Sequence, residues 1–111
     1  MGLNNAFLKI KPDIWIGCDP PQAFVDSLWQ TSFDKFYSSA WEEEEHEGKL
    51  IKEIEGMHFF NVMRAEDIPK MGKEAVAQNM PYMNFLFEGN TFSVAMSILR
   101  WLGIRKIYLV G

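Results

Sequence analysis

Two polar segments of this 111-residue chain have residue types and positions suited to ligand binding. Gly89, Asn90, Thr91 and Ser93 lead into a predicted helix, whose free backbone N–H groups attract a phosphate or a carboxylate. Asn90 or Thr91 is also expected to cap that helix. Asp19 follows a predicted buried strand, which is where α/β sheets bind ligands. Asp19 is equally suited to cap the next helix, and the two roles are compatible.

Alternating strands and helices are expected to position these residues. The apolar and branched runs predict strands at 13–18, 35–39, 57–62 and 106–110. Helical spacing or flanking residues predict helices at 6–10, 22–30, 41–55 and 91–102, the last one ended by Gly103. Residues 64–82 are expected to form a loop, either a lid or a plain surface insertion. This alternation predicts an α/β fold with a parallel sheet and right-handed crossovers.

The size and composition of the chain limit the classes of protein that it can belong to. One domain is the most that 111 residues support, and a hydrophobic content of 48% is enough for a core. The net charge is −4 without a basic stripe, which argues against nucleic acid as a partner. No apolar run is long enough to span a membrane. A single cysteine, Cys18, excludes an internal disulfide and suits the cytoplasm.

Other residues with chemical potential have simpler interpretations. His46 lies beside Glu42–Glu45 and Glu47, but a run of one charge is usually solvated surface, so we predict no metal site. His58 is expected to be exposed or structural, because no nucleophile or orienting partner accompanies it. Cys18 is expected to pack within its strand. The common dinucleotide, NTPase, hydrolase and zinc-protease motifs are absent from the sequence.

Three segments together resemble a known family. They are Gly2–Asn5 (GLNN), Pro12–Asp19 (PDIWIGCD) and Gly89–Gly111, which closes with Leu102–Gly111 (LGIRKIYLVG). They are similar to the Rossmann-like domain shared by the motility accessory factor and 6-hydroxymethylpterin pyrophosphokinase-like proteins, the domain of unknown function 115 group. That group is in turn similar to the family 42 sialyltransferases. The glycine-rich turn and the final aspartate of the family pattern fall outside this sequence, so residues 1–111 are expected to be one partial domain.

This resemblance implies a Rossmann-like parallel sheet with helices on both faces, truncated at both ends. It also implies part of a nucleotide- or nucleotide-sugar-dependent transferase that is glycosyltransferase-like. The nucleotide donor would be a substrate, so no cofactor is expected. The residues implied to bind it are Asn4 and Asn5 at the nucleotide, Asp19 at the cleft edge, and Thr91 and Ser93, with Asn90, at its phosphate or carboxylate. Asn4 and Asn5 are also suited to cap a short helix.

A non-catalytic α/β binding or protein-interaction module is the alternative. Its surface would combine the acidic segment Glu42–Glu47 with exposed aromatic side chains, for which the candidates are Trp29, Trp41, Phe59 and Phe60. The sequence assigns no catalytic base and no oligomeric state.

Overall fold

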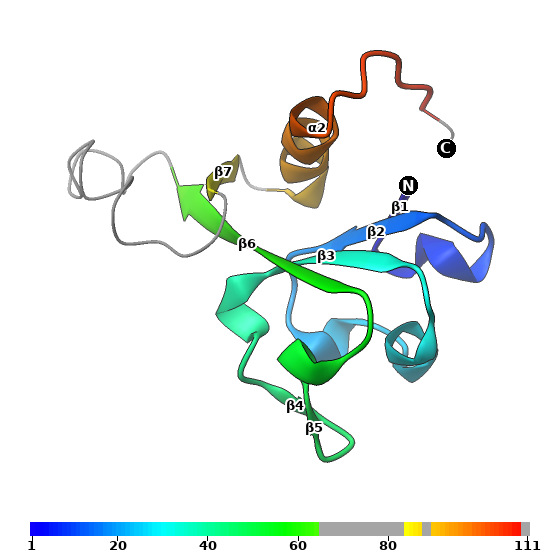
Figure 1. The fold of residues 1–111 in the computed structure, drawn as a ribbon, viewed down its shortest axis with the longest axis vertical. Helices are drawn as coiled ribbons and strands as arrows, with labels where there is room; N and C mark the ends of the chain where they lie inside the picture. The colour runs from blue at the N-terminus through cyan, green and yellow to red at the C-terminus, as the bar shows by residue number, and fades with distance from the viewer. Residues whose placement is uncertain (65–83, 88–89, 110–111) are drawn as a thin grey trace.

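The centre of the structure is a parallel β-sheet. The computed structural model describes residues 1–64, 84–87 and 90–109. The sheet runs in the order β1-β2-β3-β6-β7, and each neighbouring pair of strands is parallel (Figure 1). Its strands are β1 (Gly2–Leu3), β2 (Ile14–Gly17), β3 (Asp34–Ser38), β6 (Met57–Arg64) and β7 (Asn84–Phe87). The expected α/β class with a parallel sheet is therefore confirmed. The loop expected at 64–82 lies outside the described residues beyond Arg64.

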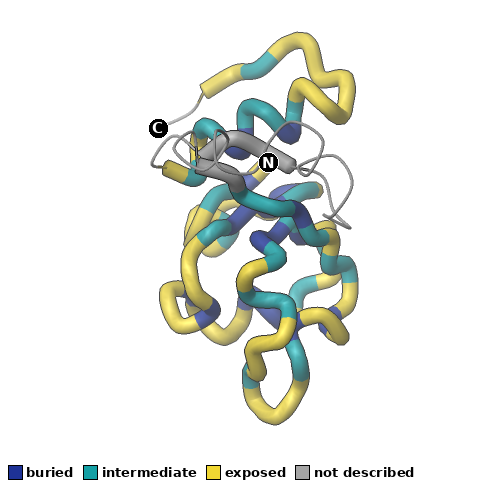
Figure 2. Tube along the Cα trace, turned by 90° about the vertical axis from the view of Figure 1, so that its left-hand side faces the viewer, coloured by how far each residue is buried: buried dark blue, intermediate teal, exposed yellow. Residues whose placement is uncertain are grey.

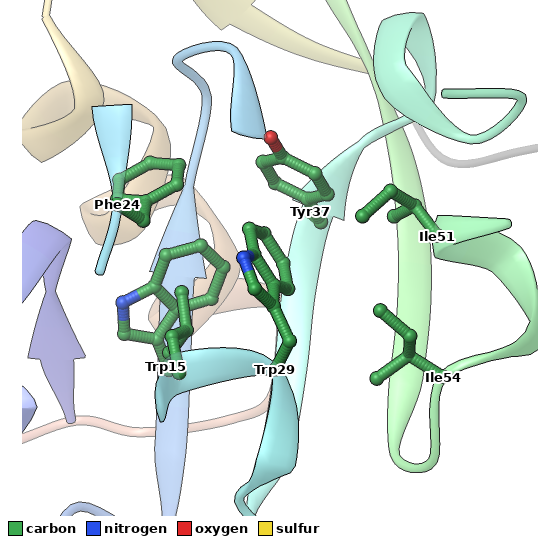
Figure 3. Close-up of a cluster of buried hydrophobic side chains, with 7 residues drawn as sticks. Trp15, Phe24, Trp29, Tyr37, Ile51 and Ile54 are labelled. Carbon is green, nitrogen blue, oxygen red and sulfur yellow. The ribbon is translucent and has the colours of Figure 1, made fainter. Parts of the chain in front are cut away.

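The two faces of the sheet carry separate hydrophobic clusters, because successive residues of a strand point to opposite faces. Trp15 and Tyr37 lie on one face, in the cluster Trp15, Phe24, Leu28, Trp29, Tyr37, Ile51 and Ile54 (Figure 3). Ile16 lies on the other face, in the cluster Ile16, Phe60, Val94, Ala95 and Ile98. Figure 2 shows the buried residues mostly in the middle of the fold and the exposed residues mostly around its outside.

One face is covered by helix α2 (Thr91–Trp101) and the other by short 3-10 helices. The 3-10 helices are η1 (Asn4–Leu8), η2 (Pro21–Ala23), η3 (Asp26–Gln30), η4 (Ser39–Trp41) and η5 (Ile51–Glu53). The single helix expected at 22–30 is wrong, because Phe24 and Val25 have extended backbones between η2 and η3. The Val25 N–H donates to Oδ1 of Asn5, which holds the chain in this extended form.

The helix expected at 41–55 is also wrong. Strands β4 (Glu45–His46) and β5 (Lys49–Leu50) form an antiparallel hairpin between η4 and η5. Glu47 and Gly48 both have positive φ angles, of 51° and 77°, as a two-residue hairpin turn requires. A run of glutamates repels itself along a helix, and Gly48 adds a further cost. The hairpin is thus the better conformation for this segment.

The strand expected at 106–110 is wrong over its described residues, 106–109. The chain at 104–109 has no strand structure, and Tyr108 is 75% exposed. The end of α2 matches the expectation, since Gly103 has φ +82° and its N–H donates to the Arg100 carbonyl while that of Ile104 donates to the Leu99 carbonyl. Strand composition alone does not make a strand, because a strand also needs a paired neighbour.

The aromatic surface expected of an interaction module is absent from the residues that were named for it. Trp29 and Phe60 belong to the two cores, with exposed fractions of 6% and 1%. Trp41 and Phe59 are half-buried and pack against the first cluster. These aromatic side chains therefore stabilise the fold.

Candidate functional site

The carboxyl end of β2 and the N-terminus of α2 meet at one edge of the sheet. β2 ends at Gly17, and Cys18 and Asp19 follow it. Thr91, the first residue of α2, lies close enough to the Cys18 thiol to lower its pKa, and Cys18 packs against the cluster that contains Val94 and Ala95 of α2. Because Asp19 is the next residue after Cys18, two of the expected binding positions are brought to the same place. The candidate site is this edge, defined by Cys18, Asp19 and Asn90–Ser93.

The N-terminus of α2 is capped as the sequence predicts. Oδ1 of Asn90 accepts a hydrogen bond from the Ser93 N–H at 2.9 Å, and the Ser93 hydroxyl donates to the Asn90 carbonyl at 2.9 Å. The first N–H groups of a helix have no partner within it. With Ser93 satisfied, and within the residues that the structure describes, the N–H groups of Thr91 and Phe92 are the ones left to meet a ligand. They carry the positive end of the helix dipole.

Asp19 does not cap η2, so that interpretation is wrong. The N-cap position is occupied by Pro20, without a side-chain bond, and Pro21 opens the helix as expected. The Asp19 residue is exposed, but its backbone is anchored by a buried residue. The Tyr37 hydroxyl donates a hydrogen bond to the Asp19 carbonyl at 2.7 Å. The Trp41 indole likewise donates to the Cys18 carbonyl at 2.8 Å. The fold thus fixes this turn and leaves the Asp19 carboxylate in solvent.

Tyr37 and Trp41 are positioning residues that sequence reasoning missed. Tyr37 belongs to a short strand and Trp41 directly precedes the glutamate run, and nothing in either local sequence indicates that the polar atom reaches the turn after β2. Both contacts join residues distant in the chain, so they depend on the parallel pairing of β2 with β3. A sequence pattern reports which face a side chain occupies and not which carbonyl it reaches.

The Cys18 thiol is held in its protonated form. Burial raises its pKa from the ordinary 9.0 to about 11, the Asp19 carboxylate adds to the increase, and the nearby Thr91 side chain opposes it. The thiolate is the nucleophilic form of cysteine. Cys18 at neutral pH is therefore a packing group, in agreement with the role expected from the sequence.

This raised pKa predicts a loss of stability in alkaline solution. Above pH 9 the unfolded chain releases the Cys18 proton while the folded chain retains it, so the free energy of unfolding falls until about pH 11. The contribution lost is roughly 2–3 kcal/mol. Urea titrations across this range should show the stability difference between the wild type and Cys18→Ala changing by that amount. A constant difference would contradict the pKa assignment.

Asn4 and Asn5 are held on the opposite face of the sheet from α2. Asn4 has φ +49°, and its carbonyl accepts a hydrogen bond from the Trp15 indole at 2.7 Å. Oδ1 of Asn5 accepts from the Val25 N–H at 3.3 Å. The N-cap of η1 is Leu3, without a side-chain bond, so the expected asparagine cap is wrong. Asn4 still follows the carboxyl end of β1, the strand beside β2.

The two histidines lie away from this edge. Nε2 of His58 is 2.9 Å from Oδ1 of Asp34, and its ring stacks on Phe36, so it is an exposed structural residue as expected. His46 packs against Trp29 and lines a cavity of about 330 Å³, whose lining includes none of the expected site residues. Within residues 1–64, 84–87 and 90–109, no three His, Cys, Asp or Glu side chains cluster as metal ligands.

Comparison with protein-family models, with curated proteins and with solved structures found no match for this chain. Among the described parts of the chain, no helix has the length and apolar character needed to cross a membrane.

Proposed function

We propose that this chain is the nucleotide-binding part of a cytoplasmic, glycosyltransferase-like transferase with a Rossmann-like sheet. The observation that carries the proposal is the packing of Cys18 against the cluster that includes Val94 and Ala95 of α2, with Thr91 near its thiol, which brings the N-terminus of α2 beside the turn containing Asp19. An anion site and a carboxylate at the carboxyl edge of a parallel sheet are the two groups that bind a nucleotide in many α/β proteins.

Each group has a distinct role in the proposal. The N–H groups of Thr91 and Phe92 bind the phosphate of a nucleotide or nucleotide-sugar donor. The Ser93 hydroxyl supports this helix start through its hydrogen bond to the Asn90 carbonyl. The Asp19 carboxylate accepts hydrogen bonds from the hydroxyl groups of the ribose. Asn4, which follows the carboxyl end of β1 beside β2, extends the site along this edge toward the base, whereas the Asn5 side-chain oxygen is taken by the Val25 N–H. The rate enhancement comes from holding donor and acceptor together and from stabilising the departing phosphate electrostatically.

Nucleotide binding should raise the melting temperature of the chain. A ligand at 100 times its Kd stabilises the folded state by about 2.7 kcal/mol, which corresponds to a shift on the order of 10 °C in a domain of this size. Thermal-shift measurements with cytidine and uridine mono- and diphosphates should show this effect. The matching nucleosides should give a much smaller shift, because they lack the phosphate.

Two aspartates at opposite ends of β2 provide a matched control. Asp19 and Asp13 are both exposed, and they lie after the carboxyl end and before the amino end of the strand. Asp19→Ala should weaken nucleotide binding at least about fivefold, the effect of losing a charge-assisted hydrogen bond, and Asp13→Ala should leave binding unchanged. The absence of a shift with every nucleotide, or equal effects of the two substitutions, would contradict the proposal.

A further inference from the structure

The described C-terminal part of the chain, residues 90–109, is basic and apolar. It contains Arg100, Arg105 and Lys106 and no Asp or Glu. Its exposed large apolar side chains are Phe92, Trp101, Leu102, Ile104, Tyr108 and Leu109. In a chain of net charge −4, this is a local concentration of positive charge and exposed apolar area. A surface of this kind marks an interaction site whose partner is acidic.

A groove of about 520 Å³ lies on this surface. It is lined by Met96, Ser97 and Arg100 of α2 and by Ile104, Arg105 and Ile107 of the segment that follows. Two guanidinium groups and apolar walls suit a ligand that combines carboxylates with apolar side chains. The volume is enough for a few side chains of a protein partner.

The backbone beside the groove also favours a polypeptide as the occupant. The last backbone hydrogen bond recorded for the described C-terminal residues runs from the Ile104 N–H to the Leu99 carbonyl. Within the described residues, the N–H and C=O groups of 105–109 therefore have no backbone partner. Such groups pair with an added strand, whereas an anionic lipid surface offers no equivalent ladder of donors and acceptors.

The hairpin β4–β5 provides an acidic segment of matching chemistry. Glu45 and Glu47 are exposed in the hairpin, and Glu43 and Glu44 are exposed directly before it. Nζ of Lys52 lies 2.6 Å from Oε1 of Glu43 and neutralises its charge. Among the described residues, Glu44, Glu45 and Glu47 form no ion pair. Figure 1 shows the hairpin and α2 at opposite ends of the molecule, so one copy of the chain does not reach its own groove with its own hairpin.

We propose that this groove, formed by α2 and residues 104–107, binds the acidic hairpin β4–β5 of a second copy of the chain. The carboxylates of Glu44, Glu45 and Glu47 face Arg100 and Arg105, and the exposed apolar side chains around the groove cover the rest of the contact. Because the two surfaces differ, the association is head to tail and continues from copy to copy. Its charged contacts are separate from the nucleotide site, because neither the groove lining nor the hairpin contains a nucleotide-site residue. Phe92 alone is shared, with its side chain on the surrounding surface and its backbone N–H at the nucleotide site.

Charge reversal tests this pairing in both directions. Sedimentation analysis of the wild type should show a mass that rises with protein concentration and falls with added salt. Arg100→Glu with Arg105→Glu should weaken self-association at least about tenfold, because like charges then face each other. Glu44→Lys with Glu45→Lys should have the same effect. A mixture of the two variants should form a complex, since the intact hairpin of the first variant meets the intact groove of the second.

Lys9→Glu with Lys11→Glu is the matched control. Both lysines are exposed and lie outside the groove and the hairpin, and this variant has the same net charge as the arginine variant. It should associate as the wild type does. The proposal is overturned if the wild type stays monomeric at every concentration or if the mixture of reversed variants stays monomeric. It is also overturned if the wild type does not self-associate but binds vesicles of anionic lipid, and Arg100→Glu with Arg105→Glu abolishes this vesicle binding.

Discussion

Replacement of Gly17 by alanine is expected to lower the free energy of unfolding by about 3 kcal/mol or more, at the upper end of overpacking effects. A Cβ atom at Gly17 would lie 2.1 Å from Cη2 and 2.6 Å from Cζ2 of Trp15, which sits over Gly17 on the same face of β2. The Trp15 ring is completely buried and touches the rings of Phe24, Trp29 and Tyr37 at centroid distances of 5.0, 6.2 and 5.7 Å. The indole therefore has no space into which to move.

Two comparisons isolate this steric cause. Gly48→Ala places its Cβ in open space, so only the left-handed backbone at φ +77° opposes it, at a cost of about 1–2 kcal/mol. In a Trp15→Leu background the smaller side chain frees the space over Gly17, and the additional cost of Gly17→Ala should nearly vanish. Urea unfolding followed by circular dichroism measures all four variants. An undiminished cost in that background would show that the contact with Trp15 is not the cause.

Replacement of Lys35 by alanine is expected to cost about 3 kcal/mol or more, from lost packing and unpaired carbonyls together. Lys35 is completely buried, and its ammonium donates to the carbonyls of Thr31, Phe33 and Glu55 at 2.7, 3.0 and 3.2 Å. Burial lowers the pKa of this ammonium, while the carboxylates of Glu55 and Asp34 act in the opposite direction. Removal of the side chain leaves a cavity and three carbonyls without their donor.

Lys35→Met separates the two contributions. Methionine keeps most of the aliphatic volume and loses only the ammonium, so the expected cost is about 2 kcal/mol, the penalty for unsatisfied buried polar groups. Lys11→Ala serves as the exposed control and should change the free energy of unfolding by less than about 0.5 kcal/mol. If Lys35→Ala also fell within that range in urea titrations, the ammonium would not join these three loop carbonyls in solution.

The parts of the fold that depend on local sequence were predictable. The parallel alternation, the Asn90 cap and the Gly103 terminus each follow from residue types within a few positions of each other. Lys35 was not predictable, because lysine is almost always exposed and its acceptors come from separate turns. The failed helices at 22–30 and 41–55 have the same explanation: tertiary contacts and turn geometry outweighed a helical spacing of apolar residues.

The candidate site also combines features that the local sequence predicts with features that it does not. Asp19 and the start of α2 were expected to bind ligands because of their positions after a strand and before a helix. Their juxtaposition depends on the contact between Cys18 and Thr91, which links distant parts of the chain and has no local signal. For Asn4 and Asn5 the local interpretation as caps failed, because the left-handed backbone of Asn4 turns the chain toward Trp15 instead.

The two hydrophobic clusters are separate, so the candidate site lies between two layers: the sheet with its aromatic cluster, and helix α2. Every buried residue of the aromatic cluster lies between Trp15 and Ile54, so that layer is complete without α2, whereas the other cluster takes Val94, Ala95 and Ile98 from α2. Units with fewer buried contacts open more readily than the rest of a protein. A ligand that contacts both Asp19 and Thr91 would stabilise the packing of α2 on the sheet. Part of its binding free energy would then offset the cost of ordering this helix, so the observed affinity would be lower.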